Sequence, residues 1–276
     1  MIKINGKEIS SNKFPDGTFL LNLKVDNWDN ATIEWNFENN EEALMLMFLT
    51  RHLQNYNVSY IELVMPYIPN ARQDRVKYSE DVFTLKYFAE FINSLGFNKV
   101  IVFDPHSSVS EALIDNLVID NPQRFIDDVI TKIYRSINHE KLMAFYPDEG
   151  AMKRYSNMIG MPYVFGIKKR EWRTGKILGL DIGGDAESIK EKNVLIIDDI
   201  SSRGGTFYHS AKKLKELGAK NIYLYVSHCE ETILEGEIFT SGLIDKVFTT
   251  NSIFTDKAYN HAKELGFDTK IEVLSL

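Results

Sequence analysis

A run of four apolar residues, Val194 to Ile197, leads directly into two aspartates and a polar loop that carries two glycines. A short apolar run bounded by polar residues is typical of a strand buried on both faces, as in a parallel sheet covered by helices. After the loop, apolar residues recur at helical spacing from Phe207 to Leu217, and Gly218 ends the repeat. The sequence therefore predicts an α/β fold in which a buried strand, a binding loop and a helix follow one another.

The loop between this strand and this helix carries groups suited to a sugar phosphate. Asp198 and Asp199 follow the strand at its carboxyl end, where open α/β sheets bind ligands. Two carboxylates can accept hydrogen bonds from the cis hydroxyls of a ribose, or help hold Mg²⁺ through water. The small residues after them offer N–H groups to a phosphate, and the helix N-terminus adds positive potential. The predicted sugar-phosphate site consists of Asp198, Asp199, Ser201, Ser202, Arg203, Gly204, Gly205 and Thr206.

This loop resembles the phosphoribosyl-diphosphate loop shared by type I phosphoribosyltransferases and ribose-phosphate diphosphokinases (PRPP synthetases). A second segment, Pro66 to Arg75, separates the two families. Its arginines offer forked donors to a polyphosphate, although its spacing alone would also fit a charged surface loop. The segment is similar to the Pro-Tyr-x-x-Ala-Arg-Gln-Asp-Arg run of the diphosphokinases, which the transferases lack. The resemblance implies that ATP is bound by Arg72, Gln73, Asp74 and Arg75.

Two further segments resemble metal-binding parts of the same family. Phe103 to His106 resembles the family's Asp-Leu-His, with Pro105 in place of leucine, and implies that His106 binds magnesium and ATP phosphate. Tyr146 to Arg154 is similar to the family's Pro-Asp-x-Gly segment, which implies that Asp148 lies near a second metal and the ribose. The cofactor implied by the resemblance is Mg²⁺, held with the help of His106 and Asp148.

Two more segments complete the resemblance. The basic stretch from Ile167 resembles the family's mobile catalytic loop and implies that Lys168 and Arg170 close over the transferred phosphate. Lys13 to Gly17 resembles the Phe-x-Asp/Asn segment that a neighbouring subunit places around adenine. Phe14 would stack on the base and Asp16 would accept from its amino group, whereas a core phenylalanine and an Asp-Gly turn are the plain alternatives. The implied catalytic residues are Lys168, Arg170, His106 and Asp148.

The same order of helix, glycine and buried strand occurs twice, at Leu95 to Phe103 and at Leu217 to Tyr225. Together with the resemblance, it implies two tandem type I phosphoribosyltransferase-like domains, each a mainly parallel sheet flanked by helices. A chain of 276 residues is long enough for two such cores. We place an ATP-binding domain at 1–138 and a sugar-phosphate-binding domain at 139–276, with the boundary just before a strand at 142–146.

Composition excludes several other classes of protein. The single cysteine, Cys229, excludes an internal disulfide framework and favours a reducing compartment. Apolar stretches are too short for a membrane span, and a net charge of −7 disfavours nonspecific nucleic-acid binding. We expect a cytoplasmic protein, in the host cytoplasm if a phage encodes it, with neither membrane nor nucleic acid as a partner.

The resemblance implies transfer of the β,γ-diphosphate of ATP to the anomeric hydroxyl of a ribose 5-phosphate moiety, by a homo-oligomer that is a dimer or a hexamer. The acceptor is ribose 5-phosphate or ADP-ribose. Ser202 and Arg203 replace the first two residues of the family's Asp-Thr-Gly-Gly-Thr, and Arg203 suits a diphosphate, which narrowly favours ADP-ribose and a role in NAD resynthesis. Arg203 can equally swing outward and pair with an acid. The alternative functions are a type I phosphoribosyltransferase and a non-catalytic subunit of a synthetase.

Overall fold

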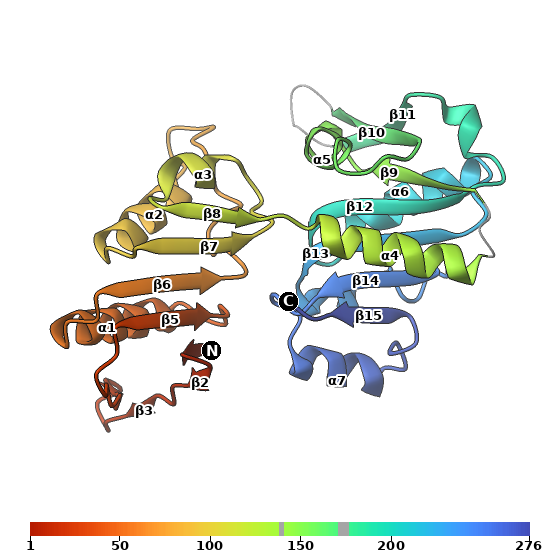
Figure 1. Cartoon of the computed structure of the whole chain (residues 1–276). Helices are drawn as coiled ribbons and strands as arrows, with labels where there is room; N and C mark the ends of the chain where they lie inside the picture. The colour runs from red at the N-terminus through yellow and green to blue at the C-terminus, as the bar shows by residue number, and fades with distance from the viewer. Residues whose placement is uncertain (138–140, 171–176) are drawn as a thin grey trace. The chain divides into compact units, whose positions relative to one another are not determined.

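The computed structural model describes residues 1–137, 141–170 and 177–276, which fold into two compact units, Met1–Asn121 and Pro122–Leu276 (Figure 1). Each unit contains its own mainly parallel sheet with helices packed on it, which confirms the predicted α/β class. Among the described residues, no helix combines the length and apolar character needed to cross a membrane.

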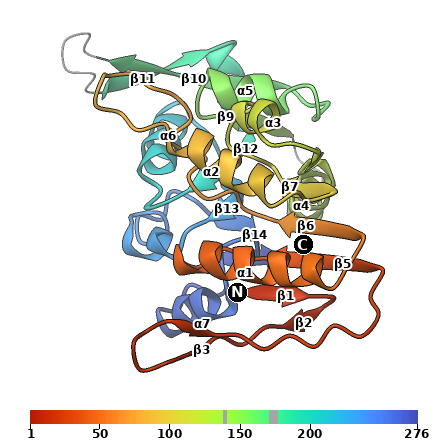
Figure 2. The same ribbon diagram turned by 90° about the vertical axis from the view of Figure 1, so that its left-hand side faces the viewer.

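The first unit is built on a six-stranded sheet. Neighbouring strands from β5 to β8 are parallel, and β1 pairs antiparallel with both β2 and β5. Burial alternates along β5 and β6, so one face of this sheet packs on α1 and α2 (Figure 2). The elements are β1 Ile2–Ile4, β2 Lys7–Glu8, a separate hairpin of β3 Asn12–Lys13 and β4 Phe19–Leu20, β5 Asn30–Trp35, α1 Glu41–Asn55, β6 Tyr60–Met65, α2 Thr84–Ser94, β7 Lys99–Phe103, α3 Val109–Leu113 and β8 Leu117–Asp120.

The second unit is built on a seven-stranded sheet in the order β11-β10-β9-β12-β13-β14-β15, parallel except for β11. The interior strand β13 is buried at all eight positions, as expected for a strand covered on both faces. The elements are α4 Gln123–Ser136, β9 Leu142–Tyr146, α5 Glu149–Tyr155, β10 Tyr163–Arg170, β11 Ile177–Gly183, the 3-10 helix η1 Ala186–Ile189, β12 Asn193–Ser201, α6 Gly205–Glu216, β13 Ile222–Cys229, the 3-10 helix η2 Glu231–Glu235, β14 Lys246–Thr250, α7 Asp256–Glu264 and β15 Ile271–Leu274.

The boundary between the units lies at Asn121/Pro122, before α4, and not at 138/139 as the sequence analysis places it. The reason is the packing of α4, which has a buried apolar stripe and lies against the second sheet in Figure 1. Lys132 of α4 forms an ion pair of 2.8 Å with Glu272 of β15. The helix that precedes Leu142 therefore belongs to the second unit, because its apolar stripe and its charged side chain both find partners there.

Candidate functional site

The two aspartates of the predicted sugar-phosphate site lie at the carboxyl end of β12. The strand extends through both of them, so that Asp199 is 4% exposed and Asp198 is half-buried. The backbone N–H of Asp199 donates to Oδ1 of Asp198 over 3.0 Å. Burial raises the pKa of Asp198 well above its usual range, and the negative charges of Asp199 and Asp148 act in the same direction. The strand end therefore gathers carboxyl groups in a place where burial opposes the ionisation of Asp198.

Asp148 reaches this site from a different part of the second unit. It is the N-cap of α5, where its Oδ1 accepts from the backbone N–H of Ala151 over 3.1 Å. Because β9 and β12 are adjacent parallel strands, their carboxyl ends meet at the same edge of the sheet. The structure thus brings Asp148 close to Asp198 and Asp199, so that carboxylates from two separate motifs meet.

The loop after the aspartates approaches a neighbouring segment so closely that two positions require glycine. Gly204 has φ +76 and is the N-cap of α6, and a Cβ built on it would lie 2.4 Å from Cγ1 of Ile238. A Cβ on Gly236 would lie 2.0 Å from the backbone oxygen of Arg203. The segment after η2 therefore packs directly against the loop and supports it, while Gly205 and Thr206 remain exposed at the start of α6.

Arg203 points to a carboxylate outside the loop. Its Nη2 donates to Oε2 of Glu235 over 2.8 Å, and the arginine side chain is 75% exposed. An ion pair between side chains this exposed contributes little to stability, and Arg203 can readily exchange Glu235 for another anion. This contact is the outward pairing that the sequence analysis gave as the alternative to a diphosphate-binding role.

The two predicted catalytic cations lie on β10. Lys168 pairs with Leu180 of β11, and the register shifts between Lys169 and Arg170. The structure describes the backbone of both residues, and their side chains lie outside the described part. Both residues lie at the carboxyl end of β10, which is parallel to β9. Asp148 follows β9, so these residues lie at the same edge of the sheet as Asp148.

The first unit joins the two motifs predicted to bind ATP. Asp74 is only 7% exposed and accepts from Arg75 at both carboxylate oxygens, over 2.7 and 2.9 Å. These hydrogen bonds lower the pKa of Asp74 from its ordinary 3.8 to about 2, and a hydrogen bond from Ser107 and the charge of His106 act in the same direction. Asp74 therefore organises the site internally, close to His106, while Arg72 and Gln73 are exposed.

The paired Asp74 predicts a specific pH dependence of stability. Because its pKa is lower in the folded chain, the pair stabilises the first unit fully above about pH 4, and this stabilisation is lost as the pH falls towards 2. Since Arg75 is largely exposed, we expect Asp74→Asn to cost only about 1 kcal/mol at pH 7. Urea unfolding of wild type and variant should give a difference that shrinks from pH 5 to pH 2, and a constant difference would contradict this account.

Phe14 and Asp16 lie in the hairpin of β3 and β4. Phe14 is 48% exposed, so it is not the core phenylalanine that was the plain alternative. Oδ1 of Asp16 accepts from the backbone N–H of Thr18 over 3.0 Å and from its hydroxyl over 2.7 Å, and these bonds lower the pKa of Asp16. The hairpin thus presents an exposed ring beside an ordered Asp-Gly turn.

The two predicted metal-binding residues fall in different units, His106 in the first and Asp148 in the second. Within the described ranges, no three histidine, cysteine, aspartate or glutamate side chains gather in a metal-binding cluster. Each residue is surrounded by its own set of site residues, Asp74 near His106 and the aspartate pair near Asp148.

Sequence reasoning missed three contributors to the site. Arg154, at the end of α5, forms an ion pair of 3.3 Å with Asp199, although the sequence analysis assigned it no role. Glu235 and Gly236 contact Arg203 from a segment more than thirty residues further along the chain. Arg154 lies in the same motif as Asp148, and this closeness in sequence could have indicated its role. No local sequence pattern indicates Glu235 or Gly236.

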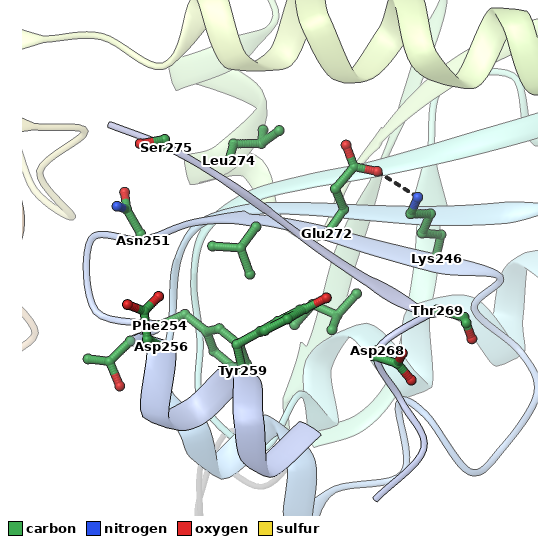
Figure 3. A pocket seen from close by; sticks show the side chains of 13 residues that line it. Lys246, Asn251, Phe254, Asp256, Tyr259, Asp268, Thr269, Glu272, Leu274 and Ser275 are labelled. Atoms are coloured by element: carbon green, nitrogen blue, oxygen red, sulfur yellow. Dashed lines mark hydrogen bonds and ion pairs between the residues drawn. The ribbon is translucent and has the colours of Figure 1, made fainter. Parts of the chain in front are cut away.

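A separate cavity of about 690 Å³ runs along β15 and the start of α7, with Tyr259 and Phe254 on one side and the ion pair of Lys246 and Glu272 on the other (Figure 3). The described residues that line it include none of the predicted site residues.

Comparison with known proteins identifies relatives over most of the chain, although no protein-family model matches it. The chain is 30% identical over 261 residues to the ribose-phosphate pyrophosphokinase of Thermococcus kodakarensis, covering 90% of this chain and 86% of the relative. It is 27% identical over 275 residues to the enzyme of that name from Staphylococcus epidermidis, covering 93% and 81%. Among solved structures, phosphoribosylpyrophosphate synthetase from Mycobacterium smegmatis matches with a TM-score of 0.76 at 19% identity, over 97% of this chain and 86% of that one, which confirms the predicted fold.

Proposed function

Because the chain belongs to the ribose-phosphate pyrophosphokinase family, we propose that it transfers the β,γ-diphosphoryl group of ATP to the anomeric hydroxyl of a ribose 5-phosphate moiety and releases AMP. The observation that carries the proposal is the end of β12, where two aspartates precede a glycine-shaped loop and the N-terminus of α6. Carboxylates suited to accept from ribose hydroxyls lie there next to backbone N–H groups suited to bind a phosphate.

The reaction requires no nucleophile from the protein. The anomeric oxygen attacks the β-phosphorus of ATP, the bond from that phosphorus to the α,β-bridging oxygen breaks, AMP leaves with the oxygen, and the hydroxyl proton is released. The protein orients the two substrates and stabilises the charge of the transferred group. We assign orientation of the acceptor to Asp198 and Asp199, and charge stabilisation to Arg72, Lys168 and Arg170.

Magnesium is the cofactor that we propose for this reaction. Carboxylate oxygens are ligands that a hard divalent cation prefers, and Asp148 offers them next to the strand end of Asp198 and Asp199. Asp148 and His106 would help to hold Mg²⁺. Its chemistry there would be to neutralise the charge of the phosphate groups.

The acceptor's 5′ substituent is the finer part of the proposal. Ribose 5-phosphate is the acceptor that the relatives' name supports, and the pairing of Arg203 with Glu235 gives this arginine a partner without a ligand. ADP-ribose is the second candidate, because the exposed Arg203 can exchange that partner for a second phosphate.

We also propose that the chain forms a homo-oligomer in the cytoplasm. Light scattering in solution would measure the mass of this oligomer.

The proposed function is tested by measuring AMP release from Mg-ATP with ribose 5-phosphate and with ADP-ribose, and by identifying each product by mass. We expect AMP with at least one acceptor and none when EDTA replaces Mg²⁺. No AMP with either acceptor would contradict the proposal.

Arg203→Ala decides between the two acceptors. If ADP-ribose is the acceptor, the loss of one charged phosphate contact should raise its KM by roughly 10-fold or more. If ribose 5-phosphate is the acceptor, its KM should change by less than about threefold, because the arginine is then occupied only by a surface ion pair. Glu235→Gln is the matched control, since it breaks the same ion pair while keeping the arginine.

A further inference from the structure

The guanidinium of Arg154 is fixed beside the aspartate pair by a buried ring. α5 packs against β12, and its last turn places Nη1 of Arg154 at 3.3 Å from Oδ2 of Asp199. The same nitrogen donates to the hydroxyl of Tyr155 over 3.5 Å, and the guanidinium carbon lies 5.6 Å from the centre of that ring. Tyr155 is completely buried. The position of the guanidinium is therefore set by the interior of the second unit and not by solvent.

The neighbouring cation on the same helix has a different environment. Lys153 pairs with Glu149 over 2.8 Å, and both side chains are about two-thirds exposed, whereas the Asp199 carboxylate of the Arg154 pair is almost fully buried. An exposed pair contributes little, but removing one member of a buried pair leaves an uncompensated charge. Arg154 thus has a stronger interaction with its partner than Lys153, although the two residues are adjacent.

The carboxylate that Arg154 contacts, that of Asp199, is one of two acids that act on Asp198. Asp198 and Asp199 are neighbours on β12, and Asp148, the N-cap of α5, adds its negative charge to the effect of Asp199 on Asp198. Mutual repulsion would turn the side chains apart unless a cation held one of them in place. Both aspartates must keep their orientation if two cis hydroxyls of one ribose are to donate to them.

We propose that Arg154 is a positioning residue for the acceptor, which holds the carboxylate of Asp199 in the orientation that receives a ribose hydroxyl. The inference rests on the proposed function and extends it, because it assigns the sugar specificity of the site to a residue that touches Asp199 and not the acceptor. This role also accounts for the positions of Asp148 and Arg154 at the two ends of α5, which bring a carboxylate and a guanidinium to the same strand end.

The test compares Arg154→Met with Lys153→Met, which removes the same charge from the same helix. We expect Arg154→Met to raise the KM for the acceptor by roughly 10- to 100-fold, to leave the KM for ATP nearly unchanged and to lower kcat by less than about fivefold. Calorimetric titration of ribose 5-phosphate in the absence of ATP should show the same loss of affinity, and Arg154→Lys should recover part of it. Lys153→Met should resemble wild type in all of these measurements.

A double variant separates positioning from folding. Arg154→Met with Asp199→Asn also removes the carboxylate charge that Arg154 contacts, so it should recover the unfolding temperature that Arg154→Met loses but not the affinity for ribose 5-phosphate. Equal acceptor KM in the Arg154→Met and Lys153→Met proteins, with an active wild type, would overturn the positioning role and leave the proposed function standing. A wild type that binds ribose 5-phosphate but releases no AMP with any acceptor would overturn the proposed function, while the affinities of the variants would still decide the role of Arg154.

Discussion

Replacing Lys168 or Arg170 with alanine is expected to lower kcat for AMP release by roughly 10²- to 10³-fold. A cation that meets the transferred diphosphoryl group interacts most strongly when the bond to the leaving phosphate is breaking, so its loss raises the barrier more than it weakens substrate binding. The KM values for ATP and for the acceptor should therefore change by less than about threefold. Single-turnover kinetics with saturating Mg-ATP measure the step directly.

Lys169 provides the control for this prediction, because it lies between the two residues on β10 and matches no catalytic position. Lys169→Ala should retain kcat within about threefold of wild type. If the three alanine variants lost activity equally, the basic stretch would act only through its total charge, and the individual roles of Lys168 and Arg170 would be wrong.

Gly236→Ala is expected to destabilise the protein by about 3 kcal/mol or more, even though alanine adds a single methyl group. The added carbon would lie 2.0 Å from the backbone oxygen of Arg203, and backbone cannot move aside as a flexible side chain can. Gly204→Ala should have a similar effect, since it combines φ +76 with a contact of 2.4 Å to Ile238. Both variants should also weaken acceptor binding, because the loop must shift away from its support.

Gly205→Ala is the matched control in the same loop. No atom lies within 4 Å of the built Cβ and the residue opens α6, so the variant should be neutral or more stable by up to about 1 kcal/mol. Denaturant unfolding of the three proteins measures the series. A Gly236→Ala protein as stable as Gly205→Ala would show that the segment after η2 does not support the loop.

Local sequence patterns predicted several elements of the fold closely. The strand expected at 142–146 is β9, and the helix expected at Phe207 to Leu217 is α6, which begins two residues earlier at Gly205. These segments have continuous apolar runs or a clear helical repeat, so their type depends mainly on their own residues. The domain boundary failed because the partner of α4 is a sheet formed by residues that come later in the chain.

The candidate site was predictable where residues adjacent in sequence also act together. Asp198, Asp199 and the glycines form one continuous strand, loop and helix, which the sequence shows directly. Asp74 was predicted to bind ATP, and the structure pairs it with its neighbour Arg75, with a smaller contribution from the 103–107 segment that the local sequence does not reveal. Arg154 and Glu235 depend on which strands are neighbours, and no local pattern contains that information.

The placement of α4 decides where this chain can be recombined with its relatives. A chimera joined at 121/122 keeps the helix, its apolar stripe and the Lys132 to Glu272 ion pair within one parental half. A junction at 138/139 would pair the helix of one parent with the sheet of the other, at about 30% identity, so its stripe would meet a surface that evolved with a different helix. Exchange of the sugar-phosphate half between acceptor specificities should therefore be made ahead of Pro122.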